Sequence, residues 1–143
     1  MAHLVAILGE SVQGKDGAPV AVRTLEDNDL LGLYFSAHWC PPCRNFTPVL
    51  SDCYKSVAAA GKKWQIIFVS SDRDIKGCKE YYDTMPWLLL PFDSDLKELL
   101  SEKYGIRGIP ALILIDPKTG QVVTANGRDV VQSDCTGEKF PWK

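Results

Sequence analysis

Two cysteines lie three positions apart in the stretch FSAHWCPPCRNFTPVL, residues 35–50, and both residues between them are proline. A Cys-X-X-Cys pair can hold a metal ion, close a small structural disulfide, or exchange electrons with a substrate as a dithiol. Cys40 directly precedes a segment that predicts a helix, and the unpaired backbone N–H groups at a helix N-terminus favour the thiolate form of a cysteine. Cys40 is therefore interpreted as the more reactive thiol of the pair.

The two prolines fit the first turn of that helix. Pro41 and Pro42 have no N–H group, but such residues are tolerated at this position, and they stiffen the loop between the sulfurs. The nearest backbone donors left for the Cys40 sulfur then belong to Cys43 and Arg44. Cys43 lies one turn into the helix and is expected to be more buried, which suits it to attack only after Cys40 has formed a mixed disulfide.

The metal and structural uses of the pair are disfavoured. A zinc site needs about four ligands, and the other cysteines and the histidines of the chain are scattered: His3, His38, Cys53, Cys78 and Cys135. A bridged metal cluster would need ligands from a partner chain. A disulfide between residues 40 and 43 closes a very short loop, and short loops stabilise a fold least. Redox chemistry is the favoured interpretation, with no metal and no bound cofactor.

Length and composition predict the number of domains, the kinds of partner and the compartment. A chain of 143 residues that is 45% hydrophobic predicts a single domain, residues 1–143. The formal charge of −2 and the absence of long charge runs predict neither a nucleic-acid nor a membrane partner. The apolar residues 4–8 are too few for a secretory signal and predict a short strand or a packed edge. Without a signal or a membrane span, the predicted compartment is the cytosol, where thiols are kept reduced.

Strands are predicted where short apolar runs are rich in β-branched and aromatic residues. These runs are residues 30–36, 64–71 and 111–116. The turn PKTG at residues 117–120 leads into a further strand at residues 121–124. The dithiol follows the first of these strands directly.

Helical periodicity predicts a helix from Pro41 to about residue 60, with a bend where Pro48 removes a backbone donor. A weaker helix at residues 74–85 is interrupted by Gly77. Other expected features are an irregular segment at residues 86–94, a helix at residues 95–104 capped by Asp93 or Ser94, and a short helix with an aromatic anchor within residues 127–143.

The order of elements predicts the architecture. The strands at residues 30–36 and 64–71 should be parallel with a right-handed crossover, and the hairpin makes the last pair antiparallel. The expected fold class is α/β, with a mixed central sheet flanked by helices on both faces. Reactive groups in such sheets lie beyond the carboxyl ends of strands, which is where Cys40 falls.

The motif WCPPC after an apolar strand, with a proline five residues past the second cysteine and Ile109-Pro110 before a late strand, resembles the thioredoxin superfamily. The stretches YFSAHWCPPCRNFTPVL, MPWLLLPFDS and the final FPW extend the resemblance to its tryparedoxin and nucleoredoxin branch, over nearly the whole chain. The resemblance implies the thioredoxin fold, Cys40 as nucleophile and Cys43 as resolving thiol. It also implies a cis bond before Pro110, which few X-Pro bonds adopt.

The resemblance further implies residues that contact a substrate. The backbone of Ile109, next to Pro110, would pair with an extended substrate segment, and Pro41 would lie beside it. Trp39 is an exposed aromatic residue in this family, although residue type alone equally favours a core position.

Two charged residues match positions that line the site in tryparedoxins. Arg128 would receive an acidic group of a glutathione-like substrate, and Asp72 would also line the site. An ordinary surface charge is an equal alternative for both residues.

One departure from ordinary thioredoxins concerns the proton of Cys43. Those proteins carry a buried aspartate six residues before the nucleophile, whereas this chain has Tyr34, a poor base at neutral pH because its pKa is near ~10. Three routes stay open for the proton: water, the Tyr34 hydroxyl as a relay, or Asp72.

The remaining thiols and one histidine have simpler predictions. Cys53 lies on the apolar face of its predicted helix and should be a small core residue. The polar neighbours of Cys78 and Cys135 indicate exposed thiols open to oxidation or glutathionylation, but a bystander role is the favoured interpretation for both. His38, next to Trp39, could tune the thiolate but more often such a histidine has no special role.

The sequence thus predicts a monomeric thiol-disulfide oxidoreductase that reduces protein disulfides through a mixed disulfide. Peroxidases are candidate substrates. The upstream donor stays open among a bis-glutathione spermidine conjugate, glutathione and a flavin-dependent reductase. The main alternative is a redox-switched binding module of nucleoredoxin type. A peroxidase is disfavoured because the peroxiredoxin motif, a Thr and a Cys after a proline, is absent.

Overall fold

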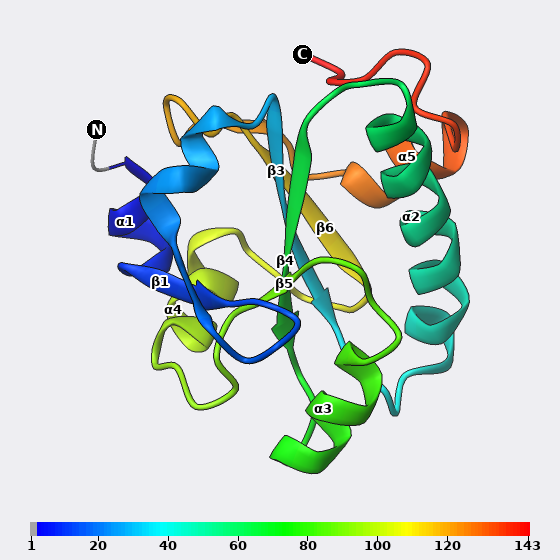
Figure 1. Cartoon of the computed structure of the whole chain (residues 1–143). Coiled ribbons are helices and arrows are strands. Elements are labelled where there is room, and N and C mark those ends of the chain that lie inside the picture. The colour runs from blue at the N-terminus through cyan, green and yellow to red at the C-terminus, as the bar shows by residue number, and fades with distance from the viewer. Residues whose placement is uncertain (1–2) are drawn as a thin grey trace.

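The strands form one mixed sheet in the computed structural model, which describes residues 3–143. Within this range the sheet order is β2-β1-β5-β4-β3-β6-β7 (Figure 1). The strands are β1 (Ser11–Gln13), β2 (Pro19–Ala21), β3 (Leu30–Ser36), β4 (Trp64–Ser70), β5 (Leu88–Leu89), β6 (Ala111–Ile115) and β7 (Val122–Thr124).

The central pairings confirm the predicted topology. Strand β3 pairs with β4 in parallel, from Leu30 opposite Trp64 to Ser36 opposite Ser70. On its other side β3 pairs antiparallel with β6, and β6 pairs antiparallel with β7. The strand that leads to Cys40 is therefore paired on both edges, with a parallel neighbour on one side and an antiparallel neighbour on the other.

Helices cover both faces of this sheet, which confirms the predicted fold class. One face carries α2 (Pro41–Ala59), α3 (Ile75–Tyr82) and α5 (Gly127–Ser133), whose buried side chains join one apolar cluster. The other face carries α1 (His3–Leu8), the 3₁₀ helix η1 (Val22–Asp27) and α4 (Leu96–Lys103), which join a second cluster. The ribbons of α2 and α5 lie on the opposite side of the sheet from α1 and α4 in Figure 1.

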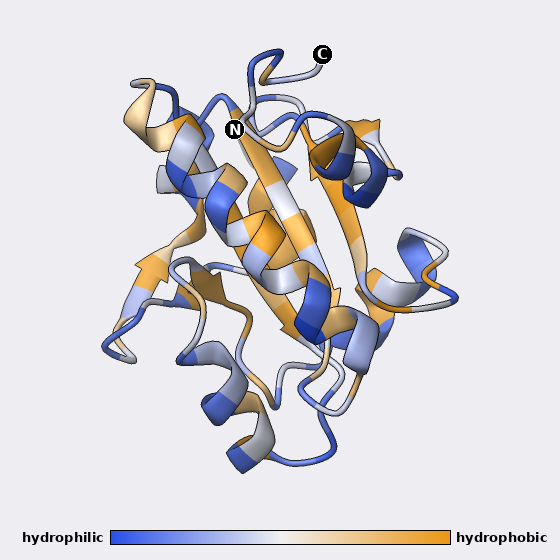
Figure 2. Cartoon of the chain, turned by 90° about the vertical axis from the view of Figure 1, so that its right-hand side faces the viewer, coloured by the Kyte–Doolittle hydropathy of each residue, from blue (hydrophilic) through white to orange (hydrophobic). Residues whose placement is uncertain are grey.

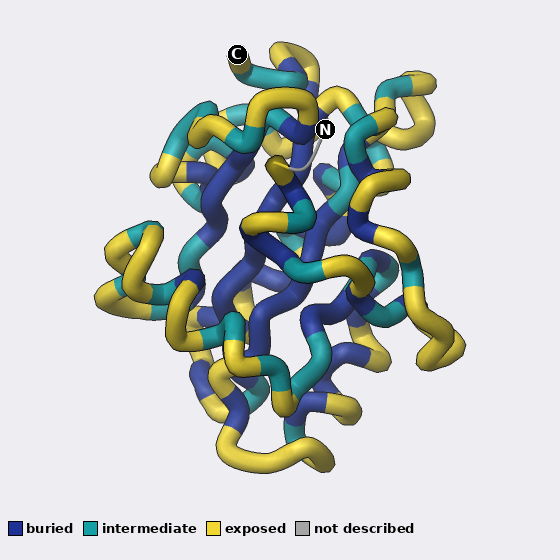
Figure 3. Tube along the Cα trace, turned by 90° about the vertical axis from the view of Figure 1, so that its left-hand side faces the viewer, coloured by how far each residue is buried: buried dark blue, intermediate teal, exposed yellow. Residues whose placement is uncertain are grey.

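Strand β3 contributes side chains to both apolar clusters, because successive side chains of a strand point to opposite faces of the sheet. Leu30 and Tyr34 join the cluster under α2, whereas Leu31, Leu33 and Phe35 join the cluster under α1. All seven residues of β3 are buried, as predicted for a strand covered on both faces. The buried central strands and the apolar colouring of the sheet are visible in Figures 2 and 3. The dithiol follows the end of this buried strand.

Two predictions for local structure are wrong. Residues 4–8 belong to helix α1 instead of a strand, because Leu4, Ile7 and Leu8 form a helical stripe that is buried on the sheet. The segment 86–94 is not wholly irregular, since it contains β5, which pairs with both β4 and β1. That two-residue strand forms through its pairing with β4 and β1, and no local sequence pattern predicts it.

Helix boundaries agree more closely with the sequence patterns. The helix predicted from Pro41 to about residue 60 is α2, and Pro48 lies inside it. Asp95 is the N-cap of α4, in place of Asp93 or Ser94, and its side chain forms no capping hydrogen bond. The Ser94 hydroxyl instead accepts the N–H of Leu96 at 3.2 Å. No helix within residues 3–143 is long and apolar enough to cross a membrane.

Candidate active site

Cys40 and Cys43 lie where β3 passes into α2, and a disulfide joins them. Cys40 is the N-cap of α2, and its sulfur accepts the N–H of Cys43 at 3.3 Å. The N–H of Arg44 was the second donor expected for the Cys40 sulfur, but it donates instead to the carbonyl oxygen of Cys40. Cys40 is 5% exposed and Cys43 is fully buried, so the predicted difference in burial is confirmed. An incoming group can approach only the Cys40 sulfur without moving the chain.

The loop before β6 lies against the dithiol. The Ile109–Pro110 bond is cis, as the resemblance implied, and the carbonyl oxygen of Ile109 lies 3.8 Å from the Cys40 sulfur. Ile109 packs on the small cluster of Ala37, Cys40 and Cys43. The structure thus brings together two segments that are 69 residues apart in sequence.

Trp39 is half exposed, at 50% of its surface, on the rim beside Cys40. Its indole N–H donates to the carbonyl oxygen of Ser71 at 3.1 Å, which fixes the ring. The guanidinium carbon of Arg73 lies 5.3 Å from the ring centroid, a cation–π contact. The exposed position implied for Trp39 is confirmed, and its contact with a substrate stays a prediction. Pro41 is also exposed, at the first position of α2.

Asp72 is buried, not an ordinary surface charge. One carboxylate oxygen accepts the backbone N–H of His38 at 2.7 Å, and the other accepts the Ser70 hydroxyl at 2.7 Å. Asp72 therefore ties the loop before Cys40 to the end of β4. A direct contact between Asp72 and a substrate stays a prediction.

Arg128 lies in the first turn of α5, where its guanidinium carbon is 6.0 Å from the ring centroid of Phe46. Phe46 belongs to the first turns of α2, so Arg128 is near the start of the helix that carries the dithiol. Its side chain is half-buried and is in no ion pair among the described residues. Contact with a substrate stays a prediction for Arg128 as well.

Four buried hydroxyl groups lie behind Cys43. The Tyr34 hydroxyl is 2.6 Å from the Thr47 hydroxyl and 3.4 Å from the carbonyl oxygen of Cys43, to which it donates. The Tyr81 hydroxyl lies 2.5 Å from that of Thr47 and 2.8 Å from that of Ser36. Burial, with a smaller contribution from Tyr81, raises the pKa of Tyr34. The Tyr34 hydroxyl therefore stays protonated at neutral pH and can pass a proton on but cannot act as a base.

Sequence reasoning identified Tyr34 but missed its partners. Thr47 follows Cys43 by four residues, so helical spacing alone would place it over Cys43. Ser36 lies two residues after Tyr34 on the same face of β3. Tyr81 comes from α3, and nothing in its local sequence connects it with the dithiol.

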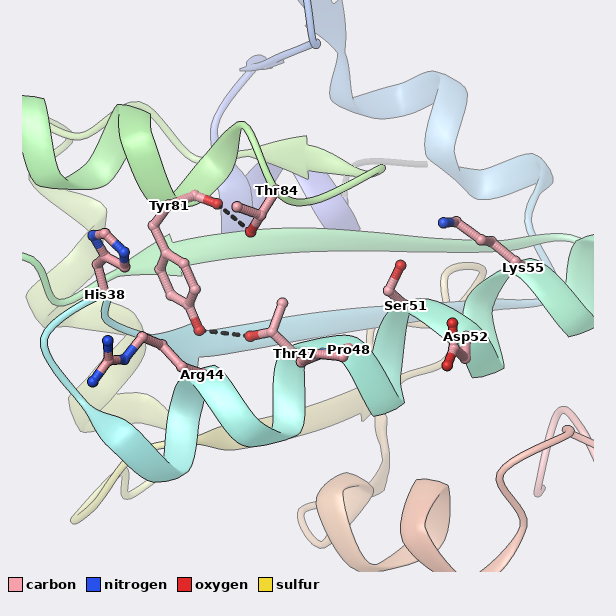
Figure 4. A pocket seen from close by; sticks show the side chains of 9 residues that line it. All are labelled: His38, Arg44, Thr47, Pro48, Ser51, Asp52, Lys55, Tyr81 and Thr84. Carbon is pink, nitrogen blue, oxygen red and sulfur yellow. Dashed lines mark hydrogen bonds between the residues drawn. The ribbon is translucent and has the colours of Figure 1, made fainter.

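The hydroxyl cluster opens into a groove between α2 and α3, with a volume of 400 Å³ (Figure 4). The His38 ring closes one end by stacking on the Tyr81 ring, with centroids 5.3 Å apart. The Tyr81 and Thr47 side chains meet at the wall of the groove in Figure 4. The groove is lined by His38, Arg44, Thr47, Pro48, Ser51, Asp52, Lys55, Tyr81 and Thr84. Thr47 and Tyr81 thus connect the buried cluster to the groove.

The three free cysteines, Cys53, Cys78 and Cys135, differ in burial. Cys53 is buried, as predicted, and its thiol donates to the carbonyl oxygen of Asp134 at 3.8 Å. Cys135 is exposed, as predicted. The prediction that Cys78 is exposed is wrong, because Cys78 shares the buried side of α3 with Tyr81 and Tyr82. Burial raises the pKa of the Cys78 thiol.

A sheet of this topology with a Cys-Pro-Pro-Cys disulfide at a strand-to-helix junction defines a class of redox protein. A family model described as "Thioredoxin-like" matches residues 28–122, and the chain belongs to that family. Within residues 3–143, no group of three or more His, Cys, Asp or Glu side chains could hold a metal ion.

Relatives within this family identify the branch. Nucleoredoxin of Homo sapiens is 46% identical over 84% of this chain, which spans 28% of that protein. The native tryparedoxin I of Crithidia fasciculata superposes with a TM-score of 0.90 at 38% identity, covering 99% of this chain and 98% of that one. A tryparedoxin II complexed with glutathionylspermidine has a TM-score of 0.83 at 36% identity, covering 93% and 91%. The chain is therefore a thioredoxin-like redox protein of the tryparedoxin and nucleoredoxin type.

Proposed function

We propose that this protein is a thiol-disulfide oxidoreductase that reduces disulfide bonds of protein substrates. The observation that carries the proposal is the Cys40–Cys43 disulfide at the N-terminus of α2, in which Cys40 keeps 5% of its surface exposed and Cys43 is fully buried. A purely structural disulfide gains nothing from that asymmetry. A dithiol that reacts in two ordered steps requires it.

In the first step the Cys40 thiolate attacks one sulfur of a substrate disulfide. A bond forms between that sulfur and Cys40, the substrate S–S bond breaks, and the second substrate sulfur leaves as a thiolate that takes a proton from water. The Cys43 N–H, 3.3 Å from the Cys40 sulfur, supports the thiolate before attack.

In the second step the Cys43 thiolate attacks the Cys40 sulfur of the mixed disulfide. The Cys40–Cys43 bond forms, the bond between Cys40 and the substrate sulfur breaks, and that sulfur leaves as a thiolate that takes a proton from water, so that two electrons have passed to the substrate. Cys43 must lose its proton first, and the hydroxyls of Thr47 and Tyr34, which donate to the Cys43 carbonyl oxygen, are the proposed relay toward the groove. A donor dithiol or a reductase then returns two electrons and two protons to the protein.

The substrate would bind across the rim around Cys40. An extended segment would pair with the backbone of Ile109 beside Pro110, and would rest on Trp39 and Pro41. Arg128 and Asp72 would complete the site. Disulfide-containing proteins, with peroxidases among the candidates, are the proposed partners, and the cytosol is the proposed compartment.

The complex of tryparedoxin II with glutathionylspermidine supports a glutathione-type thiol as the upstream donor. Glutathione itself and a flavin-dependent reductase are the competing donors. Each donor transfers the same two electrons, so the choice depends on which molecule fits beside Cys40.

The first experiment is reduction of insulin disulfides by the pure protein, with each donor offered separately. Turnover should depend on Cys40 and should vanish in Cys40→Ser, while Cys43→Ser should accumulate a mixed disulfide with insulin that mass spectrometry detects. The donor that supports turnover identifies the upstream partner. Turnover that persists in Cys40→Ser would refute the proposal.

A redox-switched binding module is a second candidate, and it is favoured by the 46% identity to nucleoredoxin. In that case the dithiol would change the affinity for a partner instead of turning over. No turnover with any donor, together with a partner affinity that differs between the oxidised and reduced protein, would select this function.

A further inference from the structure

Next to Trp39 the surface has a second hollow, with a volume of 390 Å³, which extends from the proposed substrate contacts Trp39 and Asp72 to residues that the proposed function does not use. Two arginines line it, Arg44 from α2 and Arg73 from the loop after β4, and both side chains are exposed. The hollow is lined by His38, Trp39, Arg44, Asp72, Arg73, Asp74 and Gly77. Its lining includes Trp39, the residue that precedes Cys40 in the chain.

The two acidic residues of the hollow are engaged by the protein itself. Asp72 is buried, and its oxygens accept the His38 N–H and the Ser70 hydroxyl. Asp74 is the N-cap of α3, and its side chain accepts the Gly77 N–H at 2.7 Å. The carboxylates are therefore used to hold the loops, whereas the guanidinium groups face solvent.

Neither arginine has an ion-pair partner within residues 3–143. Arg73 instead lies over the Trp39 ring, whose own N–H is bonded to Ser71. This stacking places the Arg73 charge beside the residue that precedes Cys40, and the Arg73 N–H donors form no hydrogen bond within residues 3–143. A guanidinium binds a carboxylate well because its planar donors can form two parallel hydrogen bonds.

Two further arginines lie on segments that pack against the dithiol or against the helix that carries it. Arg107 is exposed two residues before Ile109, and Arg128 lies over Phe46 on the other side of α2. The whole chain has a formal charge of −2, so the presence of these arginines does not reflect a basic composition. The rim therefore favours an anionic group beside the attacked disulfide.

We propose that the hollow is a subsite for a carboxylate side chain, Asp or Glu, that flanks the disulfide of the protein substrate, with Arg73 and Arg44 as its ligands. This inference rests on the proposed disulfide reductase function and names the class of substrate: disulfides with an acidic residue beside the attacked cysteine. Arg73 is the specificity-determining residue, because its position is fixed by Trp39.

The test measures single-turnover oxidation of the reduced protein by peptides that share one intramolecular disulfide and differ only in the residue beside the attacked cysteine. That residue is Glu, Gln or Lys. An exposed charge pair changes a rate constant by several-fold, so the Glu peptide should react about fivefold to tenfold faster than the Lys peptide. The ratio should shrink in high salt because the charges are exposed.

Variants assign the preference to individual arginines. Arg73→Gln should lower the Glu-to-Lys ratio by about fivefold, Arg73→Glu should invert it, and Arg44→Gln should lower it. Arg23→Gln is the matched control, because Arg23 is an exposed arginine of η1 on the other face of the sheet, and it should keep the wild-type ratio. Circular dichroism checks that each variant is folded.

The outcomes separate the inference from the function on which it rests. Equal rates for the three peptides, or a ratio that Arg73→Glu leaves unchanged, would overturn the subsite and keep the reductase. Oxidation by none of the peptides would overturn both. Faster reaction with oxidised glutathione than with the Glu peptide would assign the arginines to a small carboxylate substrate instead of a protein side chain, and would also overturn the inference.

Discussion

Burial divides the five cysteines into groups with different chemistry. Cys40 is at the rim and Cys43 lies beneath it, whereas Cys53 and Cys78 are enclosed by their helices and the sheet. Only Cys135 of the three free thiols is exposed. The position of each sulfur relative to solvent, more than its neighbours in sequence, decides which thiols can react.

Alkylation of the oxidised, folded protein should therefore modify Cys135 alone. Cys53 and Cys78 should react only after denaturation, because burial excludes the reagent and raises the pKa of both thiols. Iodoacetamide labelling near pH 8 followed by peptide mass spectrometry measures this. Labelling of Cys78 as fast as Cys135 would contradict the structure.

Cys53 should also make the fold sensitive to alkali. Burial, with smaller contributions from Asp134 and Cys135, raises the pKa of Cys53 from 9.0 to about 12. The thiol is thus neutral in the folded state but ionises in the unfolded state near pH 9, so its stabilising contribution is complete below pH 9 and is lost as the pH rises toward 12. Urea unfolding between pH 9 and 12 should show a shallower loss of stability in Cys53→Val than in the wild type. Equal slopes would contradict the assignment.

The hydroxyl of Tyr34 should contribute to both stability and rate. Tyr34→Phe leaves Thr47 and Ser36 with one hydrogen bond fewer and should lower the free energy of unfolding by about 1 to 2 kcal/mol. If the hydroxyl relays the Cys43 proton, the variant also closes its Cys40–Cys43 disulfide more slowly, a change that lost stability alone would not cause. Stopped-flow decay of a preformed mixed disulfide measures that step.

Tyr104→Phe is the matched control for Tyr34→Phe. The Tyr104 hydroxyl is buried and has no hydrogen-bond partner among the described residues. Its removal should therefore leave stability unchanged or slightly higher. A loss as large as that of Tyr34→Phe would show that the hydrogen bonds of the cluster contribute nothing specific.

At the scale of elements, the close packing of α5 on β6 keeps Arg128 near the start of α2. Gly127 begins α5 directly against Leu112 of β6. A Cβ atom at Gly127 would lie 2.6 Å from the Leu112 carbonyl oxygen and 2.8 Å from its Cγ atom. Only glycine allows the helix to approach the strand this closely.

Gly127→Ala should therefore destabilise the protein by about 1 to 3 kcal/mol, because helix and strand must move apart. Gly108→Ala is the control, since a Cβ atom there meets nothing within 4 Å. Thermal unfolding of the two variants measures the difference. Similar melting temperatures would mean that α5 shifts without loss of packing.

At the scale of the molecule, the chain beyond α5 closes the core under α2. The Phe140 and Trp142 rings lie 5.6 and 5.4 Å from the ring of Trp64, the first residue of β4. Asp134 accepts the Trp142 indole N–H and two backbone N–H groups, which hold this segment in place. The far end of the sheet is thus sealed by residues remote from the dithiol.

Phe140→Ala should lower the free energy of unfolding by about 3 kcal/mol because Phe140 is buried in this cluster. The control Leu99→Ala removes a side chain that is 58% exposed and should change stability by less than about 0.5 kcal/mol. Denaturant unfolding compares them. A small effect of Phe140→Ala would show that the segment is not part of the folded core.

The sequence by itself determined the position of the dithiol, and it predicted most of the architecture. A Cys-X-X-Cys pair between an apolar run and a helical repeat can be recognised from local sequence alone. The elements β3, β4, β6 and α2 are also long enough for their hydrophobic periodicity to predict them. The resemblance added the cis bond before Pro110, which no local pattern predicts.

Tertiary structure decided what depends on contacts between distant segments. Strands as short as β1, β2 and β5 form only because a neighbouring strand pairs with them, so no hydrophobic pattern predicted them. The side to which α3 turns Cys78, the meeting of Tyr81 with Thr47 and the placement of Arg73 over Trp39 likewise follow from packing. Local sequence specifies which groups can react, and the packing of remote elements specifies which of them meet.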